Sequence, residues 1–102
     1  MTQKADTNIR TVAVKIEGRV QGVYFRAWTY DTAQSLGLDG TVRNMSDGSV
    51  EAVFSGPADI VADMLRRCED GPSGARVTKV TILKEGGTVA PGFKVMATDR
   101  WR

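Results

Sequence analysis

The sequence has 102 residues, which is enough for one domain around one hydrophobic core. Hydrophobic residues make up 41% and charged residues 25%, a composition that excludes a disordered chain. The net charge of +2 is spread along the chain without a basic block, so it gives no argument for nucleic-acid binding. The apolar runs are too short to span a membrane.

Histidine is absent, which excludes Ser-His-Asp and Cys-His nucleophile pairs, phosphohistidine chemistry and histidine metal sites. The single cysteine, Cys68, cannot form an intramolecular disulfide or a CxxC site. It lies in a helical pattern, where a buried free thiol is the ordinary interpretation and a reactive nucleophile is the alternative. An unpaired cysteine favours a reducing, cytoplasmic location.

The first ten residues, MTQKADTNIR, are polar and lack the apolar stretch of a secretory signal. We therefore expect a polar N-terminal tail over 1–10 and a single domain over 11–98.

Residues 11–17 alternate between apolar and polar side chains, which predicts a strand with one covered face. Residues 18–24 contain two glycines and predict a loop. Apolar residues then recur at helical spacing over 25–36, and Gly37 is placed to end that helix.

A second strand is predicted over 38–44, followed by a tight reversal at 45–48, where Asp-Gly supplies a positive φ. A third strand begins at Val50. Gly56-Pro57 is predicted to open a second helix, with proline at its first position, and Gly71-Pro72 to end it. The apolar stripe of this helix contains Ile60, Val61, Met64, Leu65 and Cys68. Two more strands are predicted, one over 76–83 and a short one over 93–96.

The predicted order is β-α-β-β-α-β with a short extra C-terminal strand. One apolar face per strand and one stripe per helix favour two layers, with both helices on one face of an antiparallel sheet. The expected fold class is α+β, a ferredoxin-like two-layer sandwich. The first crossover makes the first and second strands parallel, so we expect the loop 18–24 and Asn44 side by side at one sheet edge.

The segment GRVQGVYFR, residues 18–26, connects the first strand to the first helix. A glycine-containing loop at a helix start can direct backbone N–H groups toward an anion, and Arg26 could add a planar fork of donors for phosphate oxygens. The spacing is not that of a Walker A loop. On spacing alone, an ordinary connection with a surface arginine is the simpler interpretation.

Asn44 lies at the predicted end of the second strand, on the same face as Leu38 and Val42. An asparagine there is commonly a turn former, here for the reversal at 45–48. Its expected place beside the glycine-containing loop gives a second interpretation, in which the amide oxygen orients a water molecule. The spacing leaves both open.

GRVQGVYFR resembles the phosphate-binding signature of acylphosphatases, G-R-V-Q-G-V-x-F-R, and residues 40–51, GTVRNMSDGSVE, resemble the second motif of that family. The resemblance extends over residues 12–95. It implies that Arg26 is the phosphate-binding catalytic arginine and that Asn44 positions the attacking water. It also implies that the phosphate is cradled by the backbone amides of Gln21, Gly22, Val23, Tyr24 and Phe25.

The resemblance implies an enzyme that hydrolyses acyl phosphates to a carboxylate and inorganic phosphate. We expect no metal and no cofactor, and we interpret Asp39 and Asp47 as turn residues rather than ligands. The expected partners are a small acyl phosphate and, as competing anions, inorganic phosphate or sulfate. We expect no nucleic acid, no membrane and a cytoplasmic monomer. The sequence marks no pocket for the acyl group.

Two non-catalytic functions fit the same fold plan. RNA-recognition modules stack bases on aromatic side chains along the exposed face of the third strand. Here that face presents Glu51 and Val53, whereas Phe54 has the parity of the core. The second alternative is a regulatory, carbamoyl-phosphate-handling domain like that fused to hydrogenase maturation carbamoyltransferases. The zinc-finger and transferase regions of those proteins are lacking, which favours a stand-alone hydrolase.

Overall fold

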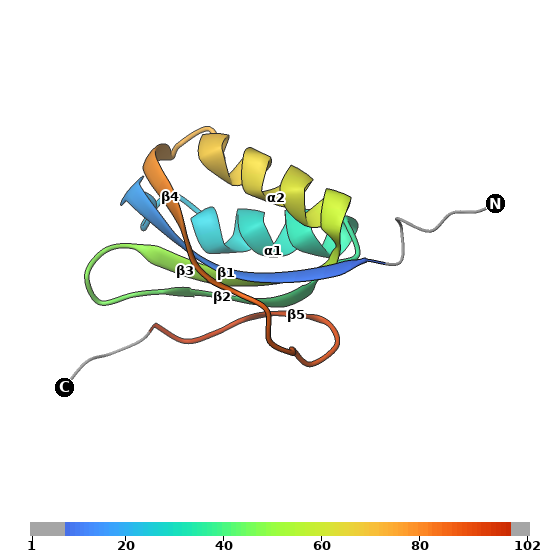
Figure 1. Cartoon of the computed structure of the whole chain (residues 1–102). Coiled ribbons are helices and arrows are strands. Elements are labelled where there is room, and N and C mark those ends of the chain that lie inside the picture. The colour runs from blue at the N-terminus through green and yellow to red at the C-terminus, as the bar shows by residue number, and fades with distance from the viewer. Residues whose placement is uncertain (1–7, 99–102) are drawn as a thin grey trace.

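The computed structural model describes residues 8–98, so residues 1–7 of the expected tail lie outside the described part. The elements follow in the order β1 (Ile9–Arg19), α1 (Phe25–Ser35), β2 (Asp39–Asn44), β3 (Val50–Pro57), α2 (Ala58–Asp70), β4 (Arg76–Glu85) and β5 (Phe93–Val95). Both helices lie on the same side of the sheet (Figure 1). The predicted ferredoxin-like α+β sandwich is confirmed.

The sheet has the strand order β4-β1-β3-β2-β5. The four longer strands pair antiparallel, as predicted, whereas β5 pairs with β2 in parallel and makes the whole sheet mixed. Because β1 and β2 each run antiparallel to β3, they are parallel to each other and end at the same edge. Figure 1 shows the end of β1, the start of α1 and the β2–β3 turn at one end of the molecule.

The strand β1 is longer than the predicted 11–17, because it begins at Ile9 and ends at Arg19. The prediction of a loop from Gly18 was therefore wrong for its first two residues. A register shift just before Gly18 lets the pairing with β4 continue through a bulge. Gly18 has a φ of 124°, and a Cβ there would lie 2.2 Å from the carbonyl oxygen of Arg76, so glycine is required.

The helix α2 begins at Ala58, and the predicted helical position of Pro57 was wrong by one residue. Pro57 is the last residue of β3, where it pairs with Ile9 of β1, and its ψ of 138° is extended. Sheet pairing therefore holds the proline outside the helix. The helix ends at Gly71, as predicted, with a φ of 65°. Among residues 8–98, no helix combines the length and the apolar character needed to cross a membrane.

The core lies between the sheet and the two helices. Its fully buried side chains alternate along the strands and recur at helical spacing: Val12, Val14, Ile16, Val42, Val50, Phe54, Phe25, Ala33, Val61, Met64 and Cys68. Cys68 is free and fully buried, which confirms the predicted buried thiol, and burial raises its pKa to about 12. Phe54 is buried and stacks on Phe93 with ring centroids 5.8 Å apart, so it is not available to stack bases.

Candidate active site

The loop between β1 and α1 contains residues 20–24 and turns sharply twice. Gly22 has a φ of 74° and Tyr24 has a φ of 70°. Tyr24 is the only residue other than glycine with a positive φ in the described part of the chain. This left-handed conformation is uncommon for a bulky residue, and such strain concentrates at functional sites. Val20 is buried before these turns and Phe25 after them, so both ends of the loop are fixed.

The N-terminus of α1 is open. Within residues 8–98, no side chain caps this helix, and its first turn contains no acidic residue. The first-turn N–H groups therefore lack side-chain acceptors, and the positive end of the helix dipole faces the loop. Thr29 donates a hydrogen bond of 2.8 Å to the carbonyl oxygen of Phe25, and the Phe25 ring packs on Trp28 at 5.3 Å. These contacts fix the turn that carries Arg26.

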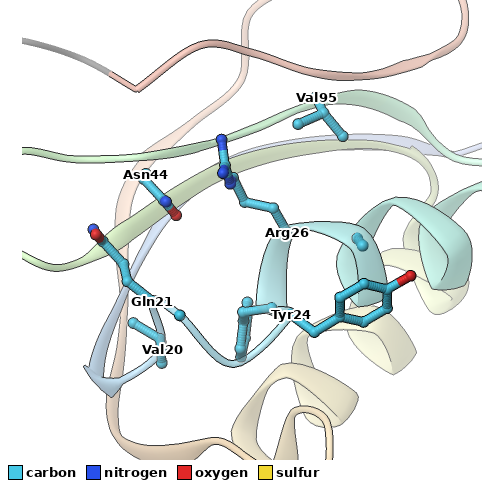
Figure 2. A pocket seen from close by; sticks show the side chains of 9 residues that line it. Val20, Gln21, Tyr24, Arg26, Asn44 and Val95 are labelled. Atoms are coloured by element: carbon cyan, nitrogen blue, oxygen red, sulfur yellow. The ribbon is translucent and has the colours of Figure 1, made fainter.

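A cavity of about 380 Å³ lies where this loop, the start of α1, the end of β2 and β5 meet (Figure 2). It is lined by Val20, Gln21, Gly22, Tyr24, Phe25, Arg26, Ala27, Asn44 and Val95. Six of the seven predicted site residues therefore share one cavity. Val23 does not line it, because its side chain packs against the core instead. The expected proximity of the loop and Asn44 is confirmed.

Arg26 and Asn44 approach each other across this cavity. Figure 2 shows the side chain of Arg26 extending from α1 toward Asn44 at the end of β2. Both residues are half-buried. In the part of the chain that the structure describes, no carboxylate forms an ion pair with Arg26. The guanidinium therefore gives the cavity a positive charge that the protein does not neutralise nearby.

The reversal after Asn44 is closed by other residues. Met45 N–H donates to the carbonyl oxygen of Ser49 at 2.8 Å, and Gly48 N–H donates to that of Met45 at 3.1 Å. The carboxylate of Asp47 accepts hydrogen bonds from the backbone N–H and the hydroxyl of Ser49 at 2.9 and 2.6 Å. Asp47 therefore fills the side-chain role in this turn, while Asn44 lines the cavity.

The side chain of Gln21 has a role that the sequence did not indicate. Its Nε2 donates two hydrogen bonds of 2.8 Å, one to the carbonyl oxygen of Met45 and one to that of Ser49. Gln21 thereby ties the β1–α1 loop to the turn that directly follows Asn44. Its acceptors are backbone groups, which have no sequence signature, so only the polar character of this position could have pointed to it.

A second tie holds the same turn to β1. Lys15 Nζ lies 3.1 Å from Oδ2 of Asp47. The hydroxyl of Ser49, its backbone N–H and the ammonium of Lys15 lower the pKa of Asp47 to about 2. Asp39 also serves a loop, because its carboxylate accepts a hydrogen bond of 2.8 Å from Gly92 N–H. Asp47 is a turn residue, as predicted, whereas Asp39 is the first residue of β2 and pairs with Ser55 of β3, so the prediction of a turn residue was wrong for Asp39.

Val95 also lines the cavity, from β5, and no feature of the sequence indicated it. It is paired in parallel register with Val42 of β2, two residues before Asn44. A strand of three residues is too short for its alternation to reveal a partner, so its side chain could not be placed from the sequence.

Residues 12–95 match the family model of acylphosphatase. The acylphosphatase of Rhizorhabdus wittichii is 52% identical over 80 residues, which cover 78% of this chain and 81% of that protein. The structure of an acylphosphatase from Coxiella burnetii has a TM-score of 0.80 and 36% identity, and the match covers 94% of this chain and 100% of that chain. A structure of full-length HypF, in its phosphate- and nucleotide-bound form, has a TM-score of 0.80 at 26% identity over 89% of this chain and 12% of that chain. The chain belongs to the acylphosphatase family.

Proposed function

We propose that the cavity between the β1–α1 loop and β2 is the active site for acyl phosphate hydrolysis. In it, Arg26 and the loop amides bind the phosphoryl group, and Asn44 positions the attacking water. The observation that carries this proposal is that Arg26 and Asn44 come from different elements and line one cavity together with the predicted loop.

The phosphate is held by three kinds of positive group. Arg26 offers a planar fork of donors that matches two phosphate oxygens. The uncapped first turn of α1 adds N–H groups and the positive end of the helix dipole. The left-handed backbone at Gly22 and Tyr24 resembles the concave turns in which successive amides surround an anion.

The reaction needs few further groups. Water attacks phosphorus, the bond between phosphorus and the acyl oxygen breaks, and a carboxylate leaves. The conjugate acid of that carboxylate has a pKa of about 4, so no general acid is required. The proton lost by the water passes to a phosphate oxygen. Phosphoryl transfer depends mainly on positioning and on stabilising charge on the equatorial oxygens, which are the roles of Asn44 and Arg26.

The test is a steady-state assay of benzoyl phosphate beside p-nitrophenyl phosphate, with EDTA present. We expect rapid hydrolysis of the acyl phosphate and almost none of the monoester, because the site has charge stabilisers but no general acid. Equal activity on both substrates, or activity lost in EDTA, would contradict the proposal.

Inorganic phosphate and sulfate should compete for the same site, since both present oxygens to Arg26 and the loop amides. The cytoplasm and a monomeric state remain our proposals for the setting in which the enzyme works. The buried, unpaired thiol of Cys68 is compatible with a reducing compartment.

A further inference from the structure

Two exposed apolar side chains stand at the mouth of the cavity. Among residues 8–98, the large hydrophobic side chains with substantial exposure are Ile9, Tyr24, Ile82, Leu83 and Val95. Tyr24 is 75% exposed and Val95 is 46% exposed, and these two line the cavity while the other three do not. Apolar surface at the rim of a polar site is the usual composition of a small-molecule pocket.

The in-line geometry of phosphoryl transfer indicates which part of the substrate would contact these two side chains. In a phosphoryl transfer, the attacking and leaving oxygens lie roughly in line on opposite sides of phosphorus. If Asn44 holds the water, the acyl oxygen must leave on the side of the phosphate away from Asn44. Figure 2 shows Asn44 on one side of the Arg26 guanidinium and both Tyr24 and Val95 on the other.

We propose that Tyr24 and Val95 form the subsite for the acyl group, and that the preferred substrates are acyl phosphates with an uncharged, apolar acyl group such as an aromatic one. This inference rests on the proposed function, because it takes the positions of the phosphate and the water from it.

The size of the cavity fits this assignment. At ~30 Å³ for each of its four oxygens, the volume of a liquid water molecule, a phosphate would fill only about a third of the 380 Å³. Tyr24, Ala27 and Val95 also line the cavity. The volume beyond the phosphate therefore leaves room for an acyl group.

The charge of the cavity lining determines which acyl groups are disfavoured. Of the described residues that line it, Arg26 alone is charged. Once Arg26 holds the reacting phosphate, an acyl group with its own carboxylate or second phosphate would find no cationic partner there. Such a charged group would lose water without gaining an ion pair, so these substrates should be disfavoured.

The backbone of Tyr24 supports a role for its ring. A tyrosine in the left-handed conformation is less favourable than glycine or asparagine would be at the same place. The ring is mostly exposed, so it contributes little to the core that could compensate. Figure 2 shows the ring directed away from the Arg26 guanidinium, where the distal part of a substrate would lie.

The experiment compares kcat/KM for benzoyl phosphate and acetyl phosphate in the unaltered protein, Tyr24→Asn and Val95→Ala. Asparagine is chosen because it tolerates a positive φ. We expect the benzoyl-to-acetyl ratio of kcat/KM to fall on the order of tenfold in each variant, as for lost apolar contacts in other substrate pockets. Ile82→Ala, which removes an exposed apolar side chain of β4 outside the cavity, is the matched control and should leave the ratio unchanged.

An unchanged ratio in Tyr24→Asn and Val95→Ala would overturn the acyl subsite. An equal loss on both substrates would overturn it as well, because it would show a structural effect rather than a contact with the acyl group. If the unaltered protein hydrolyses neither substrate, the proposed function fails and the subsite fails with it. Failure of the subsite alone is therefore distinguishable from failure of the function.

Discussion

The fold contains two strand-to-helix junctions over one sheet, and they are built in opposite ways. Between β1 and α1 the chain makes a five-residue loop, 20–24, with two left-handed residues, and Arg26 lies in the first helical turn. Between β3 and α2 there is no such loop, because the strand ends at Pro57 and the helix begins at Ala58. The first turn of α2 contains Asp59.

The first-turn residues of the two helices have different effects: one stabilises its own helix, and the other leaves the helix start open to an anion. A carboxylate in the first turn stabilises a helix through its dipole, and Asp59 does so for α2. The helix α1 has an arginine there instead, which the same dipole disfavours. The positive end of α1 is therefore open to an external anion, and a bound phosphate would supply the negative charge. One fold thus provides two helix N-termini, and we propose that the sequence of one makes it an anion site.

The largest expected effect comes from removing the charge of the β1–α1 junction. Arg26→Ala should lower kcat/KM for benzoyl phosphate on the order of 10³-fold, as loss of an arginine does in other phosphoryl transfers. Phosphate should also no longer raise the melting temperature. Arg67→Ala removes the basic residue of the last turn of α2 and should leave both measurements unchanged. A shift with phosphate that survives in Arg26→Ala would place the anion site elsewhere.

The second effect concerns the water. Asn44→Ala should lower kcat on the order of 10²-fold while KM and phosphate inhibition stay nearly constant, because in the proposed mechanism Asn44 contacts the water and not the phosphate. Asn44→Asp should be about as inactive and should bind phosphate more weakly, since it adds a negative charge. If Asn44 is instead a turn former, both variants will lose stability and keep their specific activity. Melting curves and initial rates on the same samples decide between the two.

Two substitutions change the charge at the two helix starts. Ala27→Asp gives α1 a first-turn carboxylate, which should weaken phosphate inhibition on the order of tenfold by repulsion at short range. The helix itself should not be destabilised. Asp59→Ala should lower the free energy of unfolding by about 0.3–1 kcal/mol and leave the kinetics intact. Equal kinetic effects of the two substitutions would show that the junctions do not differ as we describe.

A smaller effect is expected from removing the hydrogen bonds between the Gln21 side chain and the turn after Asn44. Gln21→Leu leaves the carbonyl oxygens of Met45 and Ser49 without their Nε2 donor. The turn after Asn44 should loosen, and kcat should fall roughly tenfold with little change in KM, because small displacements from the reactive geometry are costly. The rates are measured well below the melting temperature. A variant that melts earlier but keeps its kcat would limit Gln21 to a structural role.

The smallest effect is a pH dependence in the turn beside the site. The pKa of Asp47 is lowered to about 2, so its hydrogen bonds stabilise the folded state above the unfolded pKa, and this contribution is lost as the pH falls toward 2. Ser49→Ala removes the hydroxyl, which is the largest cause. The melting temperatures of the unaltered protein and of Ser49→Ala should differ at about pH 6 and converge near pH 2. A difference that is the same at both pH values would exclude the titration of Asp47 as its cause.

Much of the site could be predicted because it follows from strand direction. Alternation in residues 11–17 and helical spacing in 25–36 identify the first crossover, and a crossover makes its two strands parallel. The loop at the end of one strand and Asn44 at the end of the other then have to meet. Hydrophobic periodicity alone is sufficient for that inference.

What could not be predicted depends on contacts that leave no pattern in the sequence. The bulge at Gly18 depends on continued pairing with β4, and the parallel pairing of β5 determines the place of Val95. The acceptors of Gln21 are backbone carbonyl oxygens, which every residue type offers. Register and backbone acceptors are tertiary properties. The position of Val95 at the cavity and the hydrogen bonds of Gln21 therefore appear only in the folded chain.

The most direct test of the central claim is a phosphate titration followed through the backbone amide signals by NMR. We expect the amides of residues 22–26, at the start of α1, to shift in a saturable way, and those of residues 58–61, at the start of α2, not to shift. In Arg26→Ala the shifts at the first junction should disappear. Comparable shifts at both helix starts, or shifts confined to another part of the surface, would contradict the claim that only the β1–α1 junction binds the anion.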